Sequence, residues 1–137
     1  MRPVTDLTVW KETREVRALE REVLLWNDPQ AQDLIATALS VLGGYDKSYD
    51  GLELYANGYR VNYPLSPAGA FAAATARLLF GDNKGLAMLN AGFELSNNDP
   101  FWSRYARYAI QRSNLPPQER ERAISELDEV LAQRTAR

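Results

Sequence analysis

The residue types that most often carry catalysis are poorly represented in this chain. Its 137 residues include no Cys and no His. This composition excludes a thiol nucleophile, a Cys/His zinc site, a Ser-His-Asp triad and a histidine pH switch. Acid–base or metal chemistry would have to use carboxylates alone.

Carboxylates are therefore the remaining candidates for chemistry. Residues 27–99 contain eight acidic and four basic side chains, and a carboxylate pair could act as general acid and base. Most of these acids fall at expected helix starts or turns, where an anion caps free amides and interacts favourably with the helix dipole. The stretch from Asp46 to Asp50 begins like a calcium loop but lacks the downstream glutamate. We expect no catalytic residue, no metal site and no cofactor.

Aromatic and apolar side chains could instead support recognition. Tyrosines recur every four to six residues between Tyr45 and Tyr63. Packing between helices accounts for many such residues, but aromatic side chains also provide contact area at low entropic cost. On this ground we predict a protein-binding groove lined by residues of two first helices: Phe71, Thr75, Leu78, Tyr105 and Tyr108.

The elements that would position this groove are helices. Seven prolines divide the chain into blocks of helix length, and proline is tolerated between helices but not inside them. Within the blocks, apolar residues recur at steps of three and four. This periodicity predicts helices over 5–26, 29–42, 66–80, 83–96, 99–112 and 117–134.

The block 49–62 allows two interpretations. Asn57-Gly58 is a strong signal for the two-residue turn of a β-hairpin, and apolar residues alternate around it. The same residues also follow the spacing of a helix. Local sequence alone favours the hairpin.

An internal repeat of 34 residues favours the helix. A shift by this length aligns Gly51 with Gly85 and Gly58 with Gly92. The second copy lacks a turn signal and is helical in pattern, so we predict a helix over 49–62 as well. The two glycines of each copy lie seven residues apart on one face, where they would let a neighbouring helix approach closely.

The repeated unit is a helix pair, which predicts an all-α, antiparallel helix-pair solenoid of about seven helices. Trp102, Tyr105 and Ala106 have the large, large, small spacing of a first helix in the tetratricopeptide repeat family. The chain resembles that family over 28–134, as three helix pairs. The resemblance implies a concave face that binds protein. With the helix 5–26, these pairs form a single predicted domain, 1–137.

A narrower similarity concerns the class II chaperones of type III secretion systems. The stretch from Ser48 to Tyr59 and the alanine-rich stretch from Ala72 to Gly81 are similar to the central repeat of those chaperones. This similarity implies a bacterial protein that holds a hydrophobic client before export. It also allows a homodimer through the helix 5–26.

Charge and hydropathy limit the other partners. The net charge of −2 argues against sequence-independent nucleic-acid binding, which needs a basic surface. No apolar run approaches the ~18–20 residues of a membrane span, and the first six residues do not resemble a signal peptide. We predict a cytoplasmic, non-enzymatic module that holds a hydrophobic segment or helix of a client. The alternative is a regulatory or inhibitory protein, phage- or plasmid-encoded for example, that acts through its outer surface.

Overall fold

Helices make up all the regular structure in the computed structural model, which describes residues 7–44 and 48–135. Within these residues there is no strand, and the segment around Asn57-Gly58 is helical. The all-α prediction is confirmed, and the hairpin interpretation is wrong. The seven helices are α1 (Leu7–Leu24), α2 (Pro29–Leu42), α3 (Tyr49–Asn62), α4 (Pro67–Leu79), α5 (Lys84–Leu95), α6 (Pro100–Arg112) and α7 (Pro117–Thr135).

Prolines and carboxylates mark the helix starts. Helices α2, α4, α6 and α7 each begin with proline, whose missing amide hydrogen would have no partner in the first turn. Asp28 accepts hydrogen bonds from the amides of Gln30 and Ala31, both at 3.2 Å. Asp99 accepts one from the amide of Phe101 at 3.0 Å. The capping role predicted for the carboxylates is confirmed at these two residues.

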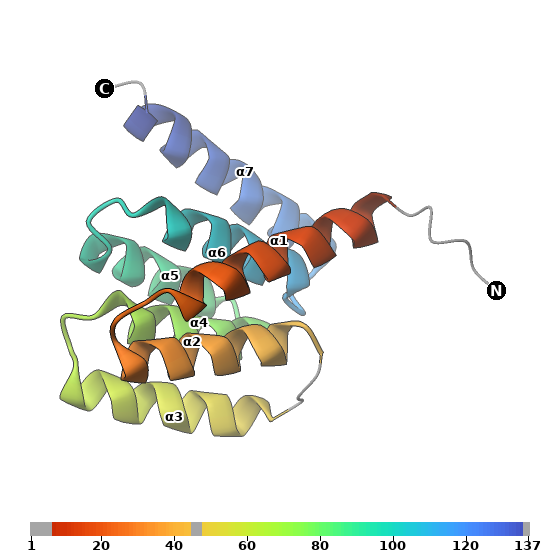
Figure 1. Cartoon of the computed structure of the whole chain (residues 1–137). Helices are drawn as coiled ribbons and strands as arrows, with labels where there is room; N and C mark the ends of the chain where they lie inside the picture. The colour runs from red at the N-terminus through yellow and green to blue at the C-terminus, as the bar shows by residue number, and fades with distance from the viewer. Residues whose placement is uncertain (1–6, 45–47, 136–137) are drawn as a thin grey trace.

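Helix α4 lies at the centre of the molecule and contacts α2, α3, α5 and α6 (Figure 1). Every residue from Ala68 to Ala76 is buried, and most of them are alanine. Small side chains on all sides let several helices approach one axis closely. The alanine-rich stretch thus forms the core of the fold.

Helix α5 runs back along α4 in close contact with it. A Cβ atom added at Gly85 would lie 2.7 Å from Cγ of Leu78, and one at Gly92 would lie 2.8 Å from Cε2 of Phe71. Real Cβ atoms do not approach other atoms so closely, so α5 requires glycine at both positions. The predicted role of the glycine pair is confirmed in α5.

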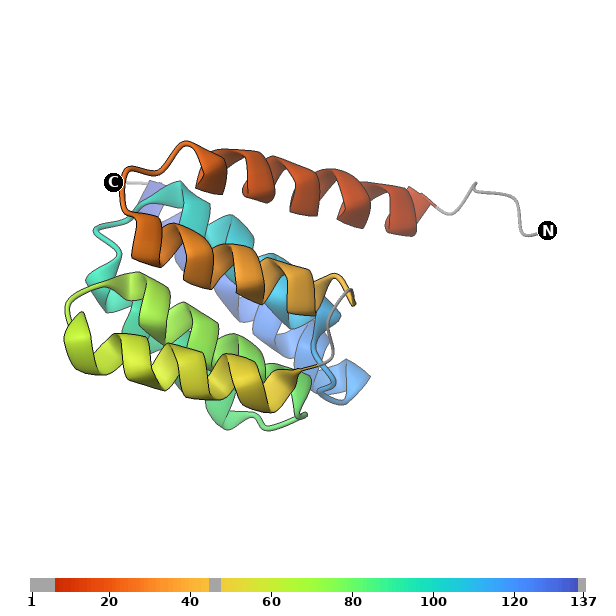
Figure 2. The ribbon, with the colours of Figure 1, turned by 60° about the horizontal axis from the view of Figure 1, so that its bottom comes forward.

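Helix α1 lies against α2 and α6 (Figure 2). Its apolar residues Val16, Leu19 and Val23 are buried. Beyond the helix end, the ring of Trp26 meets that of Phe101 edge-on, with centroids 5.0 Å apart. A dimer through the apolar stripe of 5–26 would need these side chains exposed, and here the chain's own helices cover them.

Candidate protein-binding groove

The five residues predicted to line a groove are all in the core. Phe71, Thr75, Leu78, Tyr105 and Tyr108 are each at most 3% exposed. They lie on α4 and α6, which contact each other. Since none of the five reaches the surface, they pack the interior in this structure and line no open groove.

A buried hydrogen-bond chain and a ring stack fix this contact. The Thr75 hydroxyl donates to the carbonyl oxygen of Phe71 at 2.8 Å. Because a threonine hydroxyl has one hydrogen, the Tyr105 hydroxyl must donate to Thr75 Oγ1 across 2.6 Å. Burial raises the pKa of Tyr105 well above its ordinary value, so this phenol stays protonated. The rings of Phe71 and Trp102 stack with centroids 4.4 Å apart.

An open groove lies elsewhere, between α5 and α7, and has a volume of about 460 Å³. Leu86, Leu89 and Phe93 of α5 form one wall, and Leu127 and Val130 of α7 form part of the other. Ile110 of α6 also lines it. We call this the α5–α7 groove. Its volume falls within the range of typical ligand pockets.

The groove exists because α7 packs on α6 and its C-terminal end stands away from the body (Figure 1). Ala123 and Leu127 anchor α7 through their buried side chains. An ion pair joins Arg107 of α6 to Asp128 of α7. Val130, which also lines the groove, is 43% exposed. The apolar face of α7 is therefore only partly covered by the chain itself.

Acidic side chains line the same groove. Glu94 of α5 and Glu126 of α7 are both exposed, and none of the residues that line the groove is basic. Apolar walls with an acidic edge suit a partner that presents apolar residues flanked by Lys or Arg.

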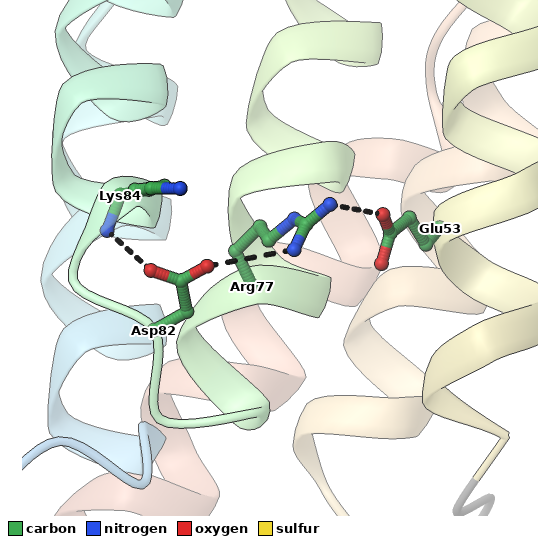
Figure 3. Close-up of polar contacts among 4 residues, drawn as sticks. All are labelled: Glu53, Arg77, Asp82 and Lys84. Carbon is green, nitrogen blue, oxygen red and sulfur yellow. Dashed lines mark hydrogen bonds and ion pairs between the residues drawn. The ribbon is translucent and has the colours of Figure 1, made fainter.

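A second polar cluster joins α3, α4 and the start of α5 (Figure 3). Arg77 Nη2 lies 2.6 Å from Glu53 Oε1, and Arg77 Nη1 lies 3.4 Å from Asp82 Oδ2. Asp82 Oδ1 accepts from the Lys84 backbone amide at 2.9 Å. Arg77 thus bridges the two carboxylates, and Glu53 and Asp82 link α3, α4 and the start of α5.

Metal binding and membrane insertion find no support in the described part of the chain. Across residues 7–44 and 48–135, no three acidic side chains come together in a way that could hold a metal ion. None of the helices there has the length and apolar character needed to cross a bilayer.

Comparisons with known proteins found no relative of this chain. The chain matches no family model, no curated protein and no solved structure.

The α5–α7 groove was not predicted from the sequence, although one signal for it was present. Leu86, Leu89 and Phe93 recur at helical spacing on α5, and Ala123, Leu127 and Val130 do so on α7.

Proposed function

We propose that this protein is a non-enzymatic binding module that holds an apolar segment of a client protein in the α5–α7 groove. The observation that carries the proposal is the groove itself, with apolar walls from α5 and α7 and acidic residues along it. Binding of an apolar partner is the activity that such a surface supports best.

The occupant that fits is an amphipathic helix with basic flanks. Two helices with a gap between them accept a third helix, whose apolar side chains at spacings of three and four enter the gap. Lys or Arg residues beside those positions would lie close to Glu94 and Glu126. Such charge pairing sets orientation and speeds association more than it raises affinity.

The resemblance to tetratricopeptide repeats supports the same class of function. Within this proposal the protein acts as a chaperone or adaptor that shields an apolar stretch of its client. The narrower similarity to class II secretion chaperones makes that client a hydrophobic bacterial protein, held in the cytoplasm before export.

A labelled model peptide tests the groove directly. The probe is a helical peptide of leucine and lysine with its leucines on one face, and fluorescence anisotropy measures its binding. We expect Val130→Glu to weaken binding about tenfold, which corresponds to ~1.4 kcal/mol, because it places a charge among apolar walls. A matched control is Leu25→Glu, which adds the same charge at an exposed leucine outside the groove.

The same pair of variants separates the proposal from its alternative. Equal binding by the wild type, Val130→Glu and Leu25→Glu would contradict the α5–α7 groove as the site. If Leu54→Glu on the exposed side of α3 then abolished binding, the outer-surface alternative would be supported instead.

A further inference from the structure

The outer side of α3 exposes several large apolar side chains. Leu54 is 75% exposed and Val61 is 81% exposed, and Leu65, just beyond the helix, is also 81% exposed. Helix α3 lies at the edge of the molecule (Figure 2). Large side chains of this kind, gathered on one helix, mark an interaction surface more often than isolated ones do.

Gly58 lies within this surface and has no explanation inside the chain. A Cβ atom added there would have no atom within 4 Å. Glycine inside a helix costs about 1 kcal/mol relative to alanine. The equivalent residue of the second copy, Gly92, makes room for Phe71. By the same logic, Gly58 makes room for a group that comes from outside the chain.

The spacing of the exposed residues on α3 indicates what would fill the space beside Gly58. Gly51, Leu54, Gly58 and Val61 are all exposed and follow steps of three, four and three, which is the pattern of a helix–helix seam. Suppose that two such helices run antiparallel and that the twofold axis passes at the height of Ala56 along each helix. Leu54 then lies opposite Gly58 of the partner subunit. Val61 then lies opposite Gly51 of the partner subunit. Each large side chain meets a position without a side chain, and the match is reciprocal.

We propose that two copies of this chain form a twofold dimer through antiparallel α3 helices. A twofold interface uses the same patch on both subunits, so it must be complementary to itself. The α3 seam, Gly51, Leu54, Gly58 and Val61, meets this condition in shape. The dimer is independent of the proposed client site, because no residue of α3 lines the α5–α7 groove.

The charges of α3 are compatible with pairing to itself. Identical residues come together near a twofold axis, where like charges would repel. The seam residues nearest the centre are flanked by Tyr55 and Asn57, which are neutral. Asp50, next to the seam, lies opposite Asn62 of the partner subunit in this register. Glu53 is already paired with Arg77 at 2.6 Å.

Sedimentation velocity of the full chain tests the proposal. We expect the wild type to sediment as a dimer, with twice the mass of the 15.5 kDa chain. Gly58→Gln should fill the space that Gly58 leaves for Leu54 of the partner subunit. It should raise the dissociation constant of the dimer at least tenfold, so that the monomer dominates. Its helix content should be retained. At a concentration where the wild type is also monomeric, its melting temperature should not fall, because glutamine is a better helix former and its Cβ meets no atom of its own chain. A wild type that remains monomeric up to its solubility limit would overturn the proposal.

Cross-linking tests the register, because the chain contains no cysteine of its own. Asn57→Cys should give a covalent dimer with a short bis-maleimide, since Asn57 lies near the proposed axis. The matched control is Ala91→Cys, the exposed residue at the same place in the second copy, which should stay largely monomeric. Equal cross-linking of the two variants would exclude α3 as the interface.

Discussion

Helices α3 and α5 align when the sequence is shifted by 34 residues, and their aligned glycines have different surroundings. In α5, Gly85 and Gly92 lie directly against Leu78 and Phe71 of α4. In α3, a Cβ atom at Gly58 would meet nothing. The two copies share their helical conformation and differ in their neighbours. A repeated sequence thus fixes local structure more reliably than it fixes contacts.

Tyrosine accounts for part of this difference. At the place where α5 has the buried Leu89, α3 has Tyr55, which is partly exposed. Its hydroxyl donates a hydrogen bond to Asp33 of α2. Tyr55 thus adds a polar contact with α2 at the edge of α3, although α3, like α5, packs mainly on α4.

The largest expected effect concerns the residue that fills the space beside Gly92. Phe71 is fully buried, and Phe71→Ala should lower the free energy of unfolding by about 4 kcal/mol because it leaves a cavity. The equivalent residue of the first copy is Thr37, whose hydroxyl bonds within its own helix at 2.8 Å. Thr37→Ala should change stability by less than ~0.5 kcal/mol. Urea unfolding of both variants measures the contrast, and similar losses would mean that the two copies pack alike.

Replacing each glycine by alanine should change the stability of the fold in opposite directions. Gly92→Ala places a Cβ 2.8 Å from the Phe71 ring, and the displacement should cost about 2 kcal/mol. Gly58→Ala meets no atom of the chain and should stabilise the monomer by about 1 kcal/mol through helix propensity. Thermal unfolding by circular dichroism, at a concentration where the monomer dominates, gives both signs. A loss of stability in Gly58→Ala would show a packing role for this glycine inside the chain.

Alkaline pH should weaken the α2–α3 contact. Burial, and then the hydrogen bond to Asp33, raise the pKa of Tyr55 from 10.0 to about 12. A raised pKa in the folded state stabilises the protein fully below pH 10, and this stabilisation is lost as pH rises toward 12. Tyr55→Phe should cost about 1 kcal/mol at neutral pH by removing the hydrogen bond.

The control for this prediction is the shape of the pH profile. Stability of Tyr55→Phe should fall less steeply between pH 10 and 12 than that of the wild type, in urea unfolding at each pH. Identical slopes would mean that Tyr55 ionises equally well in the folded and unfolded chain.

The sequence predicted the helices better than it predicted which side chains are exposed, for a physical reason. Proline positions, capping acids and apolar periodicity are local signals, and they predicted α2 with both its ends as observed. The same periodicity identifies Phe71 and Tyr105 as apolar-facing, but it does not say whether a helix or solvent lies opposite. The α5–α7 groove depends on the angle at which α7 leaves α6, which no local signal encodes.

The smallest expected change in stability concerns the ion pairs of Arg77. This residue pairs with Glu53 of α3 and with Asp82, which precedes α5. Glu53→Gln removes a partly exposed ion pair and should cost about 0.5 kcal/mol, with less effect at high salt. Asp82→Ala removes an ion pair and also the acceptor for the Lys84 amide, so about 1 kcal/mol is expected. Because a cap depends less on salt than an ion pair does, part of the Asp82→Ala effect should persist in 1 M NaCl. If both variants lost the same stability, and salt abolished the whole loss in each, Asp82 would stabilise the start of α5 only through its charge, as Glu53 stabilises α3.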